Sequence, residues 1–157
     1  MTITPNAGML RRLALAAALL LAGNLALAAK SCPLAIEGDD KMKFNVAELK
    51  VAADCTEVVL TLKHVGQLPA QTMGHNWVLT KTADFMPVAN AAVSAGLAKN
   101  YVPENDKRVL ASTKVIGGGQ TTSVKFATSK LAKGGDYTFF CSFPGHYGLM
   151  RGKLIFQ

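Results

Sequence analysis

Short runs in which apolar and polar residues alternate make up most of the chain after residue 28. Between residues 57 and 64, Val58, Leu60, Leu62 and His64 fall on one face, and the residues between them are mostly polar. The same period of two recurs at 75–80, 123–126, 137–141 and 154–156, and Gly, Asn, Asp and Pro separate the runs. A period of two indicates half-buried strands, and many short strands with turn signals indicate a sandwich or barrel. We therefore predict an all-β fold.

Three segments depart from this alternation. The alanine-rich stretch from about Asp84 to Leu97 has Pro87 in its first turn and Gly96 near its end, which predicts one short helix inserted between strands. Apolar residues at 44–46 are out of phase with those at 49–51, so we expect a bend or bulge there. The three glycines at 117–119 predict a turn, since no helix start or Lys-Ser/Thr follows to make a phosphate loop.

The first 28 residues have the features of a secretory signal peptide. Arg11 and Arg12 precede an unbroken apolar run over 13–21, and Ala26-Leu27-Ala28 gives a cleavage site of small residues. A retained membrane anchor is the alternative, but the apolar run is shorter than the roughly 20 residues a spanning helix needs. We therefore predict an exported protein with no stable membrane anchor and one domain over residues 29–157, since 129 of the 157 residues remain after cleavage.

The charge of the chain is basic without a pattern that indicates nucleic acid. The formal net charge is +7, and removal of Arg11 and Arg12 lowers it to +5. The lysines are scattered along the sequence, and no basic stripe with interleaved aromatic residues is present. We expect a solvated basic surface and no binding of nucleic acid.

Three cysteines are an odd number for an exported protein. Cys32 and Cys55 lie 23 residues apart near the start of the mature chain, and an oxidising compartment would let them form a disulfide. The loop-entropy estimate gives such a bridge a stabilising effect of about 3 kcal/mol. Cys141 is then unpaired, and a buried metal thiolate is its most economical role.

The segment 141–150 places Cys141, His146 and Met150 at Cys-x4-His-x3-Met spacing. A thiolate, an imidazole and a thioether together suit copper, because the soft sulfur atoms favour Cu(I) and imidazole binds both oxidation states. His75, in Met-Gly-His-Asn-Trp at the start of a predicted strand, can supply a second imidazole. Two imidazoles, one thiolate and a weak axial methionine are the ligands expected of a blue-copper electron-transfer centre.

Other residues near these candidates receive different roles. His64 lies on the apolar face of its strand, so we predict a buried, hydrogen-bonded core histidine, and Trp77 is also assigned to the core. Asn76 is expected to tie its strand to the Cys141 loop, and the backbone N–H groups of Asn76 and Phe143 are placed to reach the Cys141 sulfur, which would raise the reduction potential.

Two other classes of protein use cysteine and histidine side chains in a similar way. An enzyme could use Cys141 as nucleophile and His146 as base, but no orienting acid is evident and Met150 has no role in that scheme. A zinc or copper storage or delivery protein is the second alternative. Structural zinc sites usually show four Cys or His ligands, often in C-x2-4-C pairs, and this sequence has none.

The motifs Met-Gly-His-Asn-Trp-Val-Leu at 73–79 and Phe-Phe-Cys-Ser-Phe-Pro-Gly-His-x-x-Leu-Met at 139–150 resemble the azurin family of bacterial cupredoxins. The similarity extends over the whole mature chain and includes Cys32, Cys55 and the run at 38–45. It implies an eight-stranded Greek-key β-sandwich with one type 1 copper bound by His75, Cys141 and His146. Met150 and the Gly74 carbonyl are implied as axial contacts.

The resemblance also implies a periplasmic electron carrier, not an enzyme, that meets redox proteins such as c-type cytochromes or copper-containing reductases. Its implied docking patch is apolar and surrounds the edge of His146, and consists of Met42, Leu68, Met73, Phe143, Pro144, Gly145 and Leu149. Two positions depart from the usual pattern of the family. In the pair Tyr147-Gly148, the tyrosine is bulkier than the residue that the family usually has there. Val93 stands where a methionine of the patch is common in the family, so the choice of partner is left open.

Overall fold

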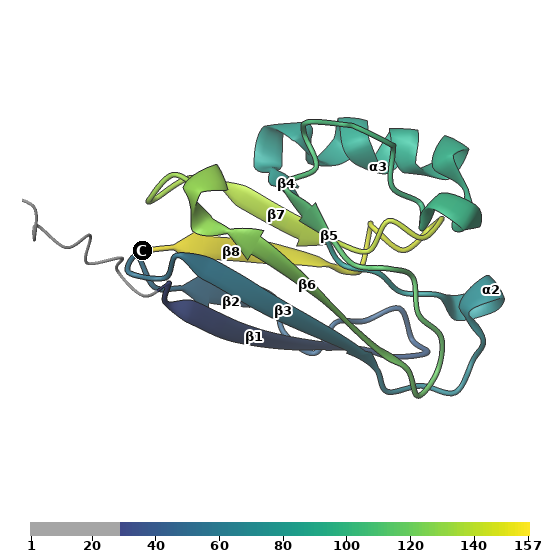
Figure 1. The fold of residues 1–157 in the computed structure, drawn as a ribbon. Helices are drawn as coiled ribbons and strands as arrows, with labels where there is room; N and C mark the ends of the chain where they lie inside the picture. The colour runs from purple at the N-terminus through teal and green to yellow at the C-terminus, as the bar shows by residue number, and fades with distance from the viewer. Residues whose placement is uncertain (1–28) are drawn as a thin grey trace, which may run out of the picture.

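The structure, a computed structural model, describes residues 29–157, and the predicted signal peptide over 1–28 lies outside the described residues. Eight strands form two sheets (Figure 1). The strands are β1 (Ser31–Gly38), β2 (Glu48–Val51), β3 (Glu57–His64), β4 (Val78–Lys81), β5 (Ala111–Ser112), β6 (Thr121–Ala127), β7 (Tyr137–Phe140) and β8 (Arg151–Phe156). The helices are α2 (Ala70–Met73) and α3 (Phe85–Ala95), and single turns of 3-10 helix lie at η1 (Thr82–Asp84), η2 (Leu97–Lys99) and η3 (Thr128–Lys130).

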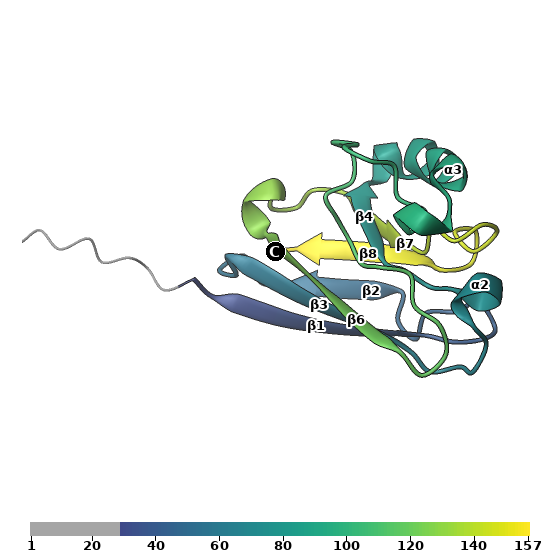
Figure 2. The same ribbon diagram turned by 45° about the vertical axis from the view of Figure 1, so that its right-hand side comes forward.

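The two sheets pack face to face as a sandwich (Figure 2). One has the order β1-β3-β6 and the other β2-β8-β7-β4-β5. The pairs β1–β3 and β2–β8 are parallel, and the remaining pairs are antiparallel. The chain passes repeatedly from one sheet to the other, so strands distant in sequence become neighbours. The predicted eight-stranded sandwich with an inserted helix is confirmed, whereas α2 was not predicted.

The core lies between the sheets and follows the predicted alternation in β3. Val58, Leu60, Leu62 and His64 all have no exposed surface. The three apolar residues belong to one cluster with Trp77, Phe126 and Phe139, in which Phe126 is the neighbour of Val58 on the adjacent strand β6. Trp77 stacks between the two phenylalanine rings at centroid distances of 6.0 Å. Its predicted place in the core is confirmed.

The second face of β4 differs from the prediction. Alternation placed Asn76, Val78 and Thr80 on the face away from the core, yet all three are buried. Val78 is buried because α3 lies over the outer face of this sheet (Figure 1) and packs Phe85 and Val88 against it. Asn76, which precedes β4, is instead covered by Ser142 and Asn100, with which it forms hydrogen bonds. The helix itself lies close to its predicted bounds and is followed by Gly96 at φ +71°, a conformation that favours glycine.

The bend predicted between the apolar residues at 44–46 and those at 49–51 is present, because a loop connects β1 to β2. After β1 ends at Gly38, a turn with Met42 at φ +56° brings the chain back, so that Phe44 forms an isolated bridge with Gly38. The strand β2 starts only at Glu48. The three glycines at 117–119 form a turn that leads into β6, also as predicted.

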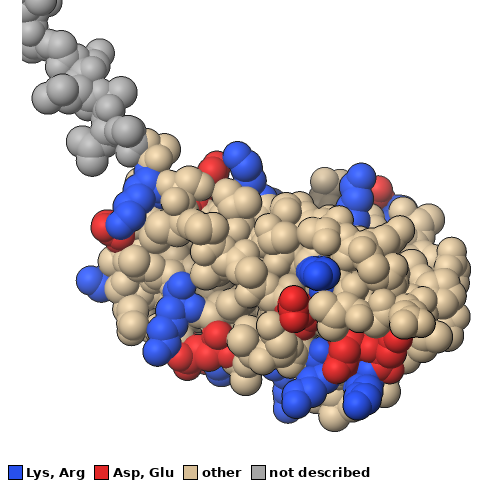
Figure 3. Space-filling model, turned by 90° about the horizontal axis from the view of Figure 1, so that it is seen from below, with Lys and Arg blue, Asp and Glu red and all other residues tan. Residues whose placement is uncertain are grey.

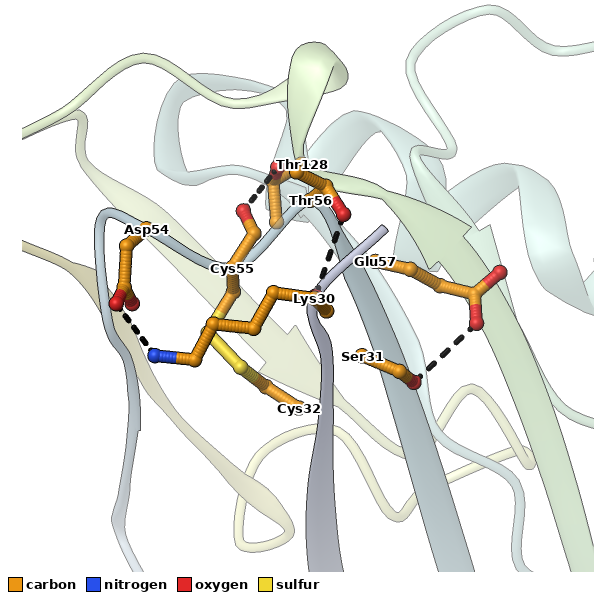
Figure 4. The surroundings of a disulfide bond; sticks show 8 residues. All are labelled: Lys30, Ser31, Cys32, Asp54, Cys55, Thr56, Glu57 and Thr128. Atoms are coloured by element: carbon orange, nitrogen blue, oxygen red, sulfur yellow. Dashed lines mark hydrogen bonds and ion pairs between the residues drawn. A yellow bond between two sulfur atoms is a disulfide. The ribbon is translucent and has the colours of Figure 1, made fainter. Parts of the chain in front are cut away.

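The predicted disulfide joins Cys32 in β1 to Cys55 in the loop before β3, with a Cα–Cα distance of 5.9 Å (Figure 4). The Thr128 hydroxyl donates to the Cys55 carbonyl at 2.6 Å, and Lys30 pairs with Asp54 beside the bridge. The disulfide therefore fastens the end of the sandwich at which the described chain begins.

Within residues 29–157, no helix has both the length and the apolar character required to cross a bilayer. Seen from below the view of Figure 1, basic and acidic side chains are interspersed over the surface (Figure 3).

Candidate metal centre

Two separate segments bring the predicted ligands together at one end of the sandwich. His75 lies in the extended segment just before β4, and Cys141 follows β7 directly. His146 and Met150 belong to the loop that connects β7 to β8. Since β4 and β7 are neighbours in the sheet, His75 and Cys141 are adjacent although 66 residues separate them.

The three predicted equatorial ligands converge on one point. The Cys141 Sγ atom lies 3.9 Å from His75 Nδ1 and 3.7 Å from His146 Nδ1, and all three ligand atoms lie within 4.8 Å of one another. Metal–imidazole and metal–thiolate bonds are about 2.0–2.3 Å long, so a single ion fits between them. Within the described residues, this is the one cluster of three His, Cys, Asp or Glu side chains with such a geometry.

The ring of His75 is held from its far side. Its Nε2 atom lies 2.8 Å from the Asp39 carbonyl, which requires the proton on Nε2 and leaves the Nδ1 lone pair directed at the cluster. The backbone of His75 exchanges two hydrogen bonds of 2.9 Å with Ile116. Gly74 allows this approach, because a Cβ atom there would lie 2.3 Å from the Ala70 carbonyl oxygen.

Burial keeps both imidazoles neutral near pH 7. It lowers the pKa of His146 to about 4, and the charges of His75 and His64 act in the same direction. Burial also lowers the pKa of His75, although its hydrogen bond to Asp39 opposes this effect. A neutral imidazole offers a free lone pair, so the two histidines are in the state that metal binding requires.

Burial acts in the opposite sense on the thiol. Cys141 has no exposed surface, and burial raises its pKa to about 12. The backbone N–H groups of Asn76 and Phe143 bear on the sulfur and lower that pKa in part. Loss of the thiol proton in this buried place therefore requires a cation at the cluster to balance the thiolate charge.

Asn76 joins the His75 segment to the Cys141 loop through both ends of its amide. Its Oδ1 accepts the backbone N–H of Ser142 at 2.8 Å, and its Nδ2 donates to the Ser142 hydroxyl at 2.7 Å and to the Asn100 carbonyl at 2.8 Å. The Ser142 hydroxyl in turn donates to the Tyr101 carbonyl at 2.7 Å. The structure thus places Asn76 in the tie that the sequence predicted.

Three residues of this network were not predicted: Ser142, Asn100 and Tyr101. Asn100 and Tyr101 both have positive φ, at 56° and 50°, and the Asn100 side chain accepts the N–H of Val115 at 2.9 Å. An asparagine tolerates this conformation better than most residues. That preference was the only sequence signal, and it does not reveal that the loop contacts the metal centre.

His64 lies against the cluster without pointing a nitrogen into it. Its ring stacks on His75 at a centroid distance of 4.3 Å. Its Nδ1 accepts the N–H of Gly66 at 3.0 Å, and its Nε2 lies 2.9 Å from the Met73 carbonyl. Both nitrogens are occupied, and the residue has no exposed surface, so the prediction of a core histidine is confirmed.

Met150 is fully buried beside His75. Both side chains pack against Gly38, since a Cβ atom on Gly38 would lie 2.8 Å from His75 Cδ2 and 3.2 Å from Met150 Cε. The Gly74 carbonyl oxygen lies 3.9 Å from the Cys141 sulfur. The Met150 side chain and the Gly74 carbonyl thus lie near this cluster, and their role as axial contacts stays a prediction.

The predicted docking residues have unequal exposure. Leu149 is 67% and Leu68 39% exposed, and Gly145 is also exposed. Met42, Met73 and Pro144 are half-buried, whereas Phe143 and His146 are buried at 8% and 3%. Phe143 packs on the His146 ring at a centroid distance of 4.6 Å, so it supports that ring more than it presents a surface.

The profile of the copper binding proteins of the plastocyanin/azurin family matches residues 30–157. The chain belongs to this family. It is 50% identical to the azurin of Bordetella pertussis over 137 residues, and this alignment covers 87% of this chain and 91% of the relative. It is 53% identical over 123 residues to azurin-1 of Alcaligenes xylosoxydans xylosoxydans, which covers 78% of this chain and 95% of the relative.

The solved structure of the azurin Az-iso2 from Methylomonas sp. strain J has the same fold. The TM-score is 0.78 at 44% identity, and the match covers 80% of this chain and 98% of that one. The resemblance deduced from the motifs at 73–79 and 139–150 is therefore confirmed. This is a blue-copper electron-transfer protein of the cupredoxin fold, and the donor set of two neutral imidazoles and one thiol fits one copper ion.

Proposed function

We propose that this protein carries single electrons between redox proteins of the periplasm, on a copper ion held by His75, Cys141 and His146. Met150 and the Gly74 carbonyl are the proposed weak axial contacts. The observation that carries the proposal is the convergence of His75 Nδ1, Cys141 Sγ and His146 Nδ1 within 4.8 Å in a buried place. Copper, when bound, supplies a one-electron couple between Cu(I) and Cu(II).

The residues of the chain serve this function by holding the ligands in one arrangement. The Asp39 carbonyl fixes the ring of His75, and Asn76 fixes the Cys141 loop. N–H groups directed at the Cys141 sulfur withdraw charge from it, which favours the reduced ion and raises the potential.

We propose that partners dock over the exposed residues around His146, chiefly Leu149 and Leu68. A small apolar surface suits brief encounters, and the partners we expect are c-type cytochromes or copper-containing reductases. The buried His146 ring lies beneath this surface and offers the shortest route for the electron. Residues 1–28 are the proposed export signal.

An electron carrier fits these residues better than an enzyme that uses Cys141 as nucleophile. The thiol has no exposed surface, and its pKa is raised to about 12, so a substrate would meet neither an accessible nor an ionised sulfur.

The proposal is tested with copper-loaded protein by visible absorption and voltammetry. Wild type should show intense blue thiolate-to-Cu(II) absorption and a reversible one-electron wave. Cys141→Ser should lose the absorption, while the matched double variant Cys32→Ala/Cys55→Ala should keep it. A colourless copper complex in wild type, or copper that passes to an acceptor protein without a reversible wave, would overturn the proposal.

Docking has a separate test. Leu149→Glu should slow electron exchange with a c-type cytochrome, and Met86→Glu, also at an exposed apolar residue, should not. Equal rates for the two variants would place the contact elsewhere.

A further inference from the structure

A hollow of about 550 Å³ on the surface of the molecule gathers cationic side chains from three segments. It lies between η1, the loop before β5, and η3, and its basic residues are Lys81, Lys107, Arg108 and Lys130. These residues are spread from position 81 to position 130, so along the sequence they appear scattered. The fold brings them to one place, which we call the basic groove.

The positive charge of the basic groove is only partly neutralised. Arg108 is paired with Asp106 through two nitrogens, at 2.9 Å from Nε to Oδ1 and 2.6 Å from Nη2 to Oδ2. Asp106 lies outside the lining, and Asp84 is the one acid among the lining residues. Lys81, Lys107 and Lys130 form no ion pair within residues 29–157, so an excess of about two positive charges is left in the groove.

The remaining lining gives the groove an apolar floor. Val109 and Leu110 are half-buried, and Lys130 Nζ donates to the Leu110 carbonyl at 3.1 Å, which holds its charge over this floor. A neutral carbonyl leaves the charge of the ammonium uncompensated. Cations around an apolar floor complement a chain of carboxylates on short aliphatic stems.

We propose that the basic groove binds an acidic peptide segment of a protein partner, rich in Asp and Glu. A hollow of this size accepts a few side chains, whereas a bilayer surface is flat. None of the seven lining residues is aromatic, so the groove offers no platform on which the bases of a nucleic acid could stack.

The groove and the docking surface around His146 are separate. Lys81 is six residues beyond His75 along an extended segment that ends in β4, and a strand rises about 3.3 Å per residue, so about 20 Å separates the two residues. An acidic segment in the groove therefore leaves the surface above His146 free. We expect the groove to steer or tether a partner without altering the copper centre.

The test uses the reduced, copper-loaded protein and a synthetic ten-residue peptide of Asp and Glu. Amide NMR shifts should change at residues 81–84, 107–110 and 130, and a matched peptide of Asn and Gln should leave them unchanged. Lys81→Glu/Lys107→Glu should weaken binding about tenfold or more. The control Lys43→Glu/Lys63→Glu alters exposed, unpaired lysines outside the groove, changes the net charge equally, and should weaken binding less than threefold.

Three results would overturn the proposal: shifts spread over all surface lysines, equal losses in the two double variants, or tighter binding to phosphatidylglycerol vesicles than to the peptide. Should Lys81→Glu/Lys107→Glu lack blue absorption and so be misfolded, Lys81→Gln/Lys107→Gln replaces it and should weaken binding at least threefold. In a parallel titration of the oxidised protein, the blue absorption of wild type should not change on binding, so failure here is distinguishable from failure of the electron-carrier proposal.

Discussion

Replacement of Asn76 by alanine tests whether its amide holds the metal centre together. The side chain has no exposed surface and makes three hydrogen bonds of 2.7–2.8 Å. Alanine leaves the Ser142 N–H and the Asn100 carbonyl without this partner, whereas the Ser142 hydroxyl still donates to Tyr101.

The expected loss of stability follows from the two polar groups that lose their partner, the Ser142 N–H and the Asn100 carbonyl. A buried polar group left without a partner costs about 1–3 kcal/mol, so with two such groups Asn76→Ala should lower the free energy of unfolding by roughly 2–6 kcal/mol. Domains of this size have free energies of unfolding of about 5–15 kcal/mol, so the variant should still fold. Copper should also bind more weakly, because the Cys141 loop loses its link to the His75 segment.

The assay is guanidinium unfolding of the copper-free, disulfide-bonded protein, followed by the fluorescence of Trp77, the only tryptophan. Asn90→Ala is the control, since Asn90 is exposed on α3 and should change stability by no more than about 0.5 kcal/mol. If Asn76→Ala also remained within about 0.5 kcal/mol of wild type, the amide would not be a structural link and our reasoning would be refuted.

Three further predictions concern acid, the disulfide and the packing around His75. Burial lowers the pKa of His146 to about 4, whereas an unfolded imidazole has a pKa of about 6.5, so the unfolded state binds more protons between these values. The free energy of unfolding of the copper-free protein should thus fall by on the order of 3 kcal/mol from pH 6.5 to pH 4. His146→Gln should reduce this dependence on pH, and equal pH dependence in wild type and variant would contradict the prediction. Cys32→Ala/Cys55→Ala should lower the free energy of unfolding by about 3 kcal/mol in a denaturant titration yet keep the blue absorption. Cys32 lies near the start of β1, whereas Gly38 beside His75 lies at its end, so the bridge is remote from the ligands, and a changed spectrum would count against that separation. Gly38→Ala should lower the free energy of unfolding by about 1–3 kcal/mol and shift the copper spectrum, because the new Cβ would lie 2.8 Å from His75 Cδ2. Gly148→Ala should match wild type in both measurements, because no atom lies within 4 Å of a Cβ at that position.

The strands and the ligands were predictable because their signals are local. Alternation in β3 reports its buried face directly, and Cys141, His146 and Met150 lie within one loop whose spacing indicates a soft metal. With three histidines in the chain and His64 on an apolar face, His75 was left as the second imidazole. Residue type and spacing along the sequence were sufficient for these assignments.

The contacts that orient the ligands were not predictable in the same way, because most of them are made by backbone atoms. The partner of His75 Nε2 is the carbonyl of Asp39, and any residue at that position presents a carbonyl. The burial of Val78 depends on where α3 packs, and the basic groove depends on how the end of β4, the loop before β5 and η3 meet. These are consequences of tertiary structure that leave no pattern in a single sequence.

The same backbone contacts explain why the site can keep its shape during electron transfer. The ligand loop closes on itself, because Cys141 N–H donates to the Met150 carbonyl at 2.9 Å and Met150 N–H donates to the His146 carbonyl at 2.8 Å. The His75 segment is fixed separately by its bridge to Ile116. None of these bonds involves the metal, so the ligand positions are determined by the fold before copper binds. The ligand atoms therefore move little when the ion gains or loses one electron. A small movement of the ligands is the condition for fast electron exchange with a briefly bound partner.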